Sequence, residues 1–214
     1  MIKRFAALVT VVAGFASLSH AADASALKLP QGVDVAIVLF EDMQCPDCAR
    51  AYPVVRDAAG AHGIPVVVYE FPLKVHNWAF EAAVYAKFFD AKSEKLGDQF
   101  RAYIYLNQAS LDPDSLGALV KKFAQEHETE LPAAIDPDGS FKRKVEADSE
   151  LGKQVGLEYT PTIFVVRRGA ASTDFVEVKD RARLGQMIEL MLHKAYPPAP
   201  VKKAVARYPV DSWS

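Results

Sequence analysis

Cys45 and Cys48 are the only cysteines of the chain, and two residues separate them. They follow an apolar run, residues 33–40, whose length and β-branched side chains are typical of a strand. The residues after them favour a helix. The pair therefore lies at a helix N-terminus, where unsatisfied backbone N–H groups and the helix dipole stabilise a thiolate. This arrangement predicts a reversible, redox-active dithiol.

The position of each cysteine in the predicted helix suggests a different role for each. Cys45 is at the exposed end, so we expect its pKa to lie below the usual value of about 8.5. It attacks a substrate disulfide, and the more buried Cys48 then releases the product. Pro46 stiffens the turn between them. Asp47 adds a negative charge that opposes ionisation of Cys45, which predicts a less oxidising site than a neutral or cationic residue would give.

Two other uses of the cysteines remain open. A structural disulfide with this spacing would close a tiny loop and contribute little stability. A zinc site needs about four ligands, and the sequence has no second cysteine pair. Beyond the N-terminal region the histidines are scattered, at His62, His76, His127 and His193. The alternative function is thus a redox-inert exported binding module that uses the cysteines as metal ligands or as a structural disulfide. For the redox function we expect no cofactor and no metal.

A second signal is Thr160-Pro161, which directly precedes a strand-like run, residues 162–167. A proline that opens a strand can follow a cis peptide bond, although only about one X-Pro bond in twenty is cis. A cis bond here would turn the backbone of Thr160 outward, where it could pair with an extended substrate.

The remaining pattern predicts the elements that position these residues. Further strands are expected at 64–71 and 174–178, the latter forming a hairpin with 162–167. Helices are expected at 45–61 and 183–194, and a helical period runs from residue 77 to 155. Within it, Asp112-Pro113 and Asp136-Pro137 are helix-start signals. The order predicts an α/β sheet with a helical block after the second strand.

Together these signals resemble the thioredoxin superfamily, and more closely its DsbA-like bacterial branch. The resemblance implies a thioredoxin fold with an inserted all-helical domain, in which 33–75 and 157–196 form the thioredoxin-like domain and 76–156 the insertion. It also implies that Cys45 is the nucleophile, Cys48 the resolving thiol and Pro161 a cis-proline facing them. Thr160 also resembles the branch that reduces or isomerises disulfides. The matching segments are residues 40–48, 71–73 and 151–162.

The chain departs from this family at one position. Relatives often bury an acid six residues before the first cysteine, and here that position is Leu39. Glu41, Asp42 and Glu70 are the candidates for a replacement proton relay. The alternative for Glu41 and Asp42 is an ordinary solvated loop acid, since most acidic side chains are exposed. His76 and Trp78 could line a groove beside the cysteines, although a buried Trp is more often part of a core.

The N-terminus predicts export. Lys3 and Arg4 precede an apolar run, residues 5–18, and small residues follow. This pattern is typical of a signal peptide, here residues 1–21, and the run is short for an uncleaved membrane anchor. We expect a leader at 22–32, a tail at 197–214, and a periplasmic or secreted protein. The absence of a basic stripe argues against nucleic acid. The expected partners are protein substrates and a membrane redox partner, and we expect a monomer; the direction of electron flow remains open.

Overall fold

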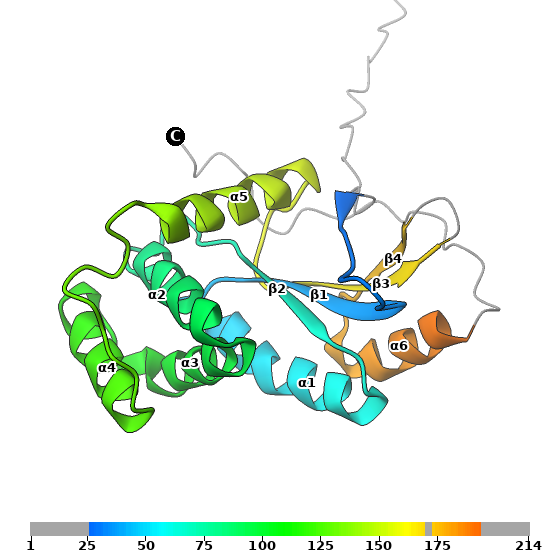
Figure 1. The fold of residues 1–214 in the computed structure, drawn as a ribbon. Coiled ribbons are helices and arrows are strands. Elements are labelled where there is room, and N and C mark those ends of the chain that lie inside the picture. Colours follow the sequence, from blue (N-terminus) through cyan, green and yellow to red (C-terminus); the bar gives the residue numbers. More distant parts are fainter. Residues whose placement is uncertain (1–25, 170–172, 194–214) are drawn as a thin grey trace, which may run out of the picture.

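The computed structural model describes residues 26–169 and 173–193 (Figure 1). The expected signal peptide, residues 1–21, and the expected tail, residues 197–214, lie outside the described residues. Part of the expected leader, residues 22–32, is described, and its Leu27 is buried against the sheet. The leader therefore contributes to the core before the first strand begins. The predicted domain boundaries stay predictions.

The centre of the described chain is a four-stranded mixed sheet in the order β2-β1-β3-β4. As predicted, the first two strands are parallel and connected by a helix, and the last two form an antiparallel hairpin. The third strand pairs antiparallel with the first. The strands are β1 (Val35–Glu41), β2 (Val66–Glu70), β3 (Thr162–Arg168) and β4 (Thr173–Glu177).

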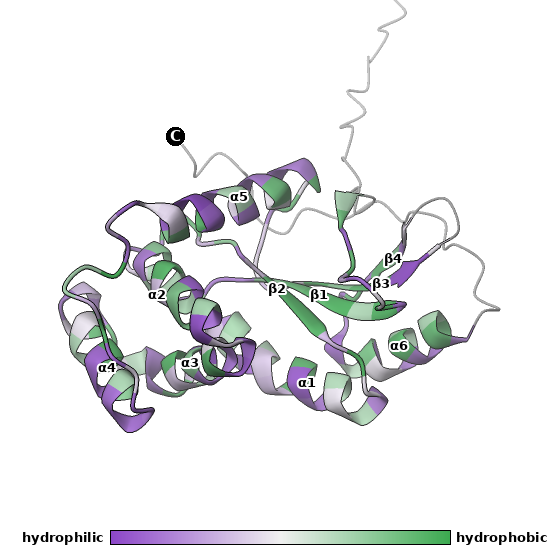
Figure 2. Cartoon of the chain, viewed as in Figure 1, coloured by the Kyte–Doolittle hydropathy of each residue, from purple (hydrophilic) through white to green (hydrophobic). Residues whose placement is uncertain are grey.

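Helices cover both faces of this sheet. On one face lie α1 (Pro46–His62) and α6 (Leu184–Leu192), and on the other lies α5 (Ser140–Gln154) (Figure 1). Alternating residues of β1 point to opposite faces. Leu39 packs in the cluster of α1 and α6, whereas Phe40 packs with residues beside α5. The central strands are apolar along their length, as expected when both faces are buried (Figure 2).

The chain between β2 and β3 is helical, as predicted. Its core is aromatic: the ring of Phe89 lies 4.6 Å from that of Phe100 and 4.9 Å from that of Phe123, measured between centroids. Cys45 and Cys48 belong to the same apolar cluster, so the helical unit packs directly behind the cysteines. Besides α5, this unit contains α2 (Ala79–Lys92), α3 (Glu94–Asn107), the 3-10 turn η2 (Gln108–Ser110) and α4 (Pro113–Glu126).

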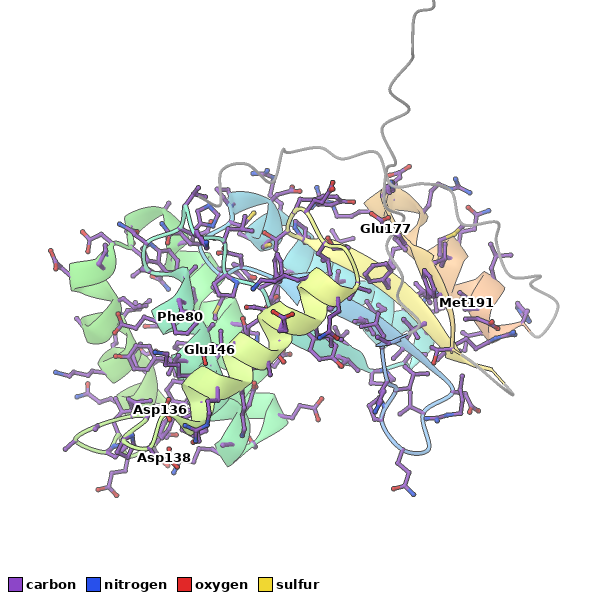
Figure 3. All side chains as sticks on the ribbon, turned by 90° about the horizontal axis from the view of Figure 1, so that it is seen from above. Phe80, Asp136, Asp138, Glu146, Glu177 and Met191 are labelled. Atoms are coloured by element: carbon purple, nitrogen blue, oxygen red, sulfur yellow. The ribbon has the colours of Figure 1, made fainter. Side chains whose placement is uncertain are left out.

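One predicted helix start is wrong by a few residues. Asp136-Pro137 does not open a helix, because α5 begins at Ser140 after a left-handed Gly139. Asp136 and Asp138 lie together in the loop before the helix (Figure 3). The carboxylate of Asp136 still accepts hydrogen bonds from the N–H groups of Phe141 (3.0 Å) and Lys142 (2.8 Å). The acid therefore caps the helix from a more distant position than an ordinary N-cap. By contrast, Asp112 caps α4 as predicted.

Within residues 26–169 and 173–193, no helix combines the length and the apolar character that crossing a bilayer requires.

Candidate active site

The topology brings distant segments together at one edge of the sheet. The parallel strands β1 and β2 both end there, and their antiparallel neighbour β3 begins there. The hairpin partner β4 ends at the same edge. The loop before α1, the loop after β2, the turn before β3 and the loop after β4 therefore meet at this edge. Each of the two sequence signals for redox chemistry lies in one of these segments.

Cys45 lies at the N-cap of α1, with an extended backbone, and Pro46 is the first helical residue. The peptide bond between Thr160 and Pro161 is cis, which confirms the sequence prediction. The thiol of Cys45 lies 3.5 Å from the carbonyl oxygen of Thr160. The structure thus places the cysteine pair and the cis-proline turn against each other, although they are far apart in the sequence.

The two thiols have opposite electrostatic environments. The pKa of Cys45 is lowered to about 6, chiefly by a hydrogen bond from the thiol of Cys48 and also by backbone N–H groups of Cys48 and Asp47. Burial, only 2% of Cys48 being exposed, raises the pKa of Cys48 well above its usual value. Both cysteines are in the reduced state. Cys45 is only 8% exposed, so the expectation of an exposed cysteine is wrong, but it lines a groove, whereas Cys48 does not. The lowered pKa suits a nucleophile, and the raised pKa suits a protected resolving thiol.

Asp42 organises the loop that carries Cys45. Its side chain is fully buried, so the interpretation as a solvated loop acid is wrong. The bond between Asp42 and His76 ties the β1–α1 loop to the β2–α2 loop and raises the pKa of His76. The carboxylate lies within hydrogen-bond distance of the N–H groups of Gln44 (2.7 Å), Cys45 (3.2 Å) and Leu73 (2.7 Å) and of Nδ1 of His76 (2.7 Å).

The charge of Asp47 is paired with arginine. Its carboxylate lies 2.8 Å from the guanidinium of Arg181 and 3.2 Å from that of Arg50. Arg50 lies one turn after Asp47 in α1, whereas Arg181 comes from the segment after β4 and could not be inferred from spacing. The backbone N–H of Asp47 also contributes to the low pKa of Cys45. The predicted effect of Asp47 on the redox potential stays a prediction.

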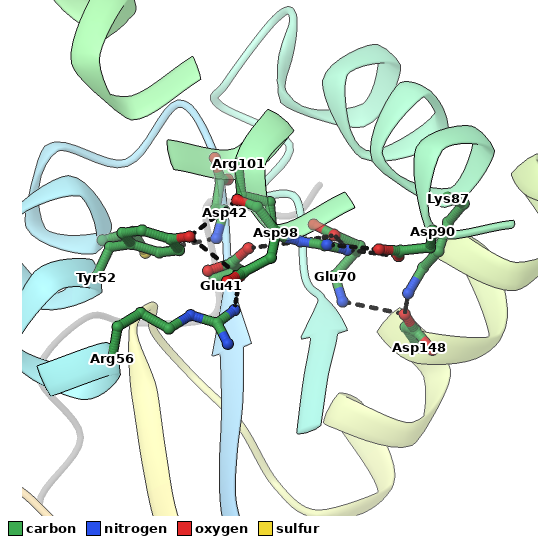
Figure 4. A network of polar contacts seen from close by, with 11 residues as sticks. Glu41, Asp42, Tyr52, Arg56, Glu70, Lys87, Asp90, Asp98, Arg101 and Asp148 are labelled. Atoms are coloured by element: carbon green, nitrogen blue, oxygen red, sulfur yellow. Dashed lines mark hydrogen bonds and ion pairs between the residues drawn. The ribbon is translucent and has the colours of Figure 1, made fainter. Parts of the chain in front are cut away.

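Glu41 is as deeply buried as Asp42, so it too is not a solvated loop acid. It is paired across the β1–β2 register with Glu70, and both carboxyl groups face Arg101 of α3 (Figure 4). Arg101 lies 3.1 Å from Glu41, 2.7 Å from Glu70 and 2.7 Å from Asp90. Burial and the neighbouring Glu70 raise the pKa of Glu41 to about 7. Burial also raises the pKa of Glu70.

The charge of Glu41 also affects the pKa of Cys48. The charge of Glu41 is among the causes that raise the pKa of Cys48, after burial and the interactions with Cys45. Burial raises the pKa of Tyr105, and the charges of Glu41 and Cys48 raise it further. Among the candidate relay acids, Glu41 acts on Cys48 through its carboxylate charge, whereas Asp42 donates its backbone N–H to the Cys48 sulfur at 3.4 Å.

Gln108 is a site residue that sequence reasoning did not select. It lies in η2, and its side-chain Nε2 donates to the carbonyl oxygens of Met43 (2.7 Å) and Cys45 (3.1 Å). The helical insertion thus holds the backbone of the cysteine loop directly. A single amide in a helical region carries no recognisable motif, so only the fold could reveal this contact.

A groove of about 710 Å³ opens beside Cys45. His76 lines it, as the sequence suggested, whereas Trp78 is buried in the helical core. Among the described residues, no cluster of three or more His, Cys, Asp or Glu side chains is arranged to hold a metal ion. The other lining residues are Pro46, Asp47, Arg50, Leu73, Lys74, Val75, Glu158, Tyr159, Thr160, Pro161, Ile163, Val178, Lys179 and Arg181.

Comparison with known proteins agrees with this geometry. Residues 32–179 match the model of a protein family described as thioredoxin. A similar solved structure is the thiol-disulfide exchange protein alpha-DsbA2 from Wolbachia pipientis, with 16% identity, a TM-score of 0.57, and coverage of 75% of this chain and 83% of that chain. A periplasmic thioredoxin-like protein from Salmonella enterica serovar Typhimurium has 15% identity, a TM-score of 0.60, and coverage of 76% and 86%.

ScsC from Proteus mirabilis, in a transitional conformation, is also similar, with 16% identity, a TM-score of 0.59, and coverage of 76% of this chain and 70% of that chain. At such identities these likenesses establish the fold. No curated protein sequence matches the chain significantly.

Proposed function

Because this chain belongs to the thioredoxin family, we propose that it exchanges disulfides with protein substrates through Cys45 and Cys48. The observation that carries the proposal is the asymmetry of the two thiols. Cys45, with a pKa of about 6, lines an open groove and faces Thr160, whereas Cys48 is buried behind it with a raised pKa. The fold is the predicted thioredoxin fold with an inserted helical unit.

The exchange proceeds in two displacements. The Cys45 thiolate attacks one sulfur of the substrate disulfide, which forms a mixed disulfide and releases the other substrate sulfur as a thiolate. Cys48 loses its proton and attacks the sulfur of Cys45, which forms the Cys45–Cys48 disulfide and expels the second substrate thiolate. Two electrons thereby pass from the protein to the substrate. The reverse sequence oxidises a substrate dithiol, and the redox partner decides the direction.

The cis-proline turn positions the substrate in this proposal. Thr160 and Pro161 line the groove beside the thiol of Cys45. An extended polypeptide in the groove pairs with the backbone of Thr160, which holds the substrate sulfur in line for attack. Such pairing uses main-chain hydrogen bonds and so accepts many sequences.

The proton of Cys48 goes to Glu41 in this proposal. A carboxyl group with a pKa near 7 is partly ionised at neutral pH, so it can both accept and return a proton. Arg101 lies near both glutamates, but it donates hydrogen bonds to Glu70 and not to Glu41. Asp42 positions the loop, so neither Glu70 nor Asp42 is assigned to the relay. If Glu41 is the relay, Glu41→Gln slows the second displacement and removes its dependence on pH near 7, while the alkylation of Cys45 is unchanged.

Export is part of the same proposal. Residues 1–21 have the pattern of a signal peptide, and the similar protein from Salmonella is described as periplasmic. The protein therefore acts in an oxidising compartment and exchanges electrons with a membrane redox partner. Cell fractionation, with the mature N-terminus read by sequencing, tests the location.

The decisive experiment is insulin reduction by the protein in the presence of dithiothreitol. Wild-type protein accelerates it, and Cys45→Ser abolishes the acceleration. Cys48→Ser accumulates a mixed disulfide with the substrate, which mass spectrometry detects. Full activity in the Cys45→Ser variant would falsify the assignment. The reduction potential against glutathione then gives the direction, since about −120 mV is typical of an oxidant and about −270 mV of a reductant.

A further inference from the structure

The groove beside Cys45 is cationic, although the chain as a whole has a formal net charge of −2. Among the described residues that line it, positive side chains outnumber negative ones by two, with His76 counted as neutral. The contrast matters because a concave site with one sign of charge concentrates its field on the ligand. The positive side chains are Arg50, Lys74, Lys179 and Arg181, and the negative ones are Asp47 and Glu158.

Ion pairing does not cancel this charge. Lys179 is paired at 3.7 Å with Glu177, which does not line the groove. With Glu177 counted, the four positive side chains still outnumber the three negative ones. The single carboxylate of Asp47 is shared by the guanidinium groups of Arg181 and Arg50. Two positive charges thus meet one negative charge. The side chain of Arg50 is 67% exposed and that of Arg181 is 32% exposed, so both remain accessible to a bound chain.

The cations flank the reactive thiol. Lys74 follows β2 and Lys179 follows β4, and these strands lie at opposite edges of the sheet. β1 and β3 lie between them. Cys45 follows the end of β1, and Pro161 directly precedes the start of β3. A polypeptide that runs across the Cys45 thiol from the β2 side of the sheet to the β4 side therefore meets a lysine on each side of its own cysteine.

We propose that the groove selects substrates in which acidic residues flank the reacting cysteine. This inference rests on the proposed disulfide exchange and adds the substrate class. The apolar lining, which includes the exposed Val75, accepts the neutral side chains of the same segment. Side chains within about 8 Å of each other interact without complete screening at physiological salt. Acidic flanks therefore raise the rate of encounter more than they tighten the final complex.

The test compares two disulfide-bonded peptides that are identical except for Glu or Lys on each side of the cysteine. We expect the rate of mixed-disulfide formation to be about tenfold higher for the Glu peptide at low salt. The difference should shrink to about twofold or less at 0.5 M salt, since screening then acts within about 4 Å. Equal rates for the two peptides, or a preference for Lys, would overturn the inference.

Charge-reversal variants test whether the lysines of the groove cause the preference for the Glu peptide. Lys74→Glu combined with Lys179→Glu should remove or invert the preference for the Glu peptide. The matched control is Lys122→Glu combined with Lys142→Glu, which makes the same change in net charge on exposed helix positions outside the groove. The control variant should keep the preference. If the preference survives in the groove variant, or is lost equally in the control, the groove is not its source.

The uncharged hydroxyethyl disulfide separates this inference from the proposed function. Wild-type protein and the control variant should exchange with it at similar rates, since it carries no charge for the groove to select. If wild-type protein fails to react with it, the proposed exchange is wrong. If it reacts but shows no preference between the peptides, only the charge selection is wrong.

Discussion

The thiol of Cys45 faces the carbonyl oxygen of Thr160 at 3.5 Å, across a sequence separation of 115 residues. The contact joins the first turn of α1 to the turn before β3, and so joins the two halves of the sheet at the reactive sulfur. In the proposed exchange, a substrate chain that pairs with the backbone near Thr160 is thereby held beside Cys45. The proposed chemistry depends on the difference between the pKa values of Cys45 and Cys48, and these pKa values can be measured.

Alkylation by iodoacetamide should report a pKa of about 6 for Cys45, while Cys48 stays unreactive up to about pH 9. The hydrogen bond from the Cys48 thiol contributes most to the low value. Cys48→Ala should therefore shift the midpoint of alkylation upward. The rate of alkylation followed against pH, with the modified residue identified by peptide mapping, checks both statements. A midpoint near 8.5 in the wild-type protein would contradict the electrostatic argument.

Titration of His76 should respond to the state of Cys45. The bond to Asp42 is the chief cause of the raised pKa of His76, and the Cys45 charge raises it further. Alkylation of Cys45 replaces the thiolate by a neutral thioether, so the pKa of His76 should fall. Asp42→Asn should lower it more, because the ion pair is lost. NMR titration of the ring signals measures both shifts.

The ring signals of His193 serve as the internal control for this titration. His193 lies at the end of α6, with its side chain 77% exposed, and does not line the groove. Its ring signals should not respond to alkylation. A value for His76 that does not move on alkylation would show that the two groups are electrostatically independent.

Glu41→Gln should change how stability depends on pH. The folded pKa of Glu41 is about 7, above an unfolded value of 4.5, so between these values the folded state binds more protons. The free energy of unfolding therefore falls as pH rises from about 4.5 to 7. The amide of the variant does not ionise and so lacks this loss. Between pH 4 and pH 8, the free energy of unfolding of the variant should therefore rise by about 3 kcal/mol relative to that of wild type. Urea unfolding at both pH values measures this.

Glu146→Gln is the matched control for that experiment. The side chain of Glu146 is 53% exposed and lies on the solvent side of α5 (Figure 3). Because this side chain is exposed, its removal should change the free energy of unfolding by no more than about 0.5 kcal/mol. A pH dependence in Glu41→Gln identical to that of wild type would mean that Glu41 ionises normally in the folded protein.

Much of this site could be predicted because its signals are local. A strand followed by C-x-x-C, and a proline opening a strand, are patterns within a few residues, and both fall where expected. The start of α5 was missed because Pro137, Asp138 and Gly139 form a turn that delays the helix. A start signal and a turn signal compete there, and the left-handed glycine decides between them.

The partners of the site residues could not be predicted, because they come from distant elements. Arg101 occupies a position in a helix where a charged side chain would ordinarily be solvated. The completed fold buries it against Glu41 and Glu70, which lie at the ends of β1 and β2. Arg181 reaches Asp47 from the other end of the chain. Pairing of this kind depends on the completed fold and leaves no periodic or spaced pattern in the sequence.

Replacement of Gly152 by alanine should destabilise the protein, because Gly152 lies close to Phe71. A Cβ at Gly152 would lie 2.5 Å from the ring of Phe71, which is 2% exposed and cannot move easily. Gly152→Ala should therefore destabilise the protein by about 1–3 kcal/mol. Gly117→Ala, in α4, meets nothing within 4 Å and should stabilise it by about 0.5–1 kcal/mol. Thermal unfolding compares the two, and equal effects would contradict the packing argument.

Arg101→Met should be the most damaging of these substitutions. Arg101 is 3% exposed and is the guanidinium that faces Glu41 and Glu70 where they lie side by side at the ends of β1 and β2. Without it, two buried carboxyl groups repel each other, and the loss should be about 3–5 kcal/mol at pH 8. The loss should be smaller at pH 5, because Glu41, with a pKa of about 7, is then largely neutral.

The double variant with Glu41→Gln tests whether this repulsion is the cause of the damage. Removing one of the two acids should restore part of the lost stability at pH 8, so the two substitutions should be non-additive by about 1–3 kcal/mol. Arg56→Met is the comparison, since Arg56 is 25% exposed and pairs with the partly exposed Asp98. It should cost only about 0–1 kcal/mol. Additive losses, or the same loss at pH 5 and pH 8, would show that Arg101 supports the fold through packing and not by compensating buried charge.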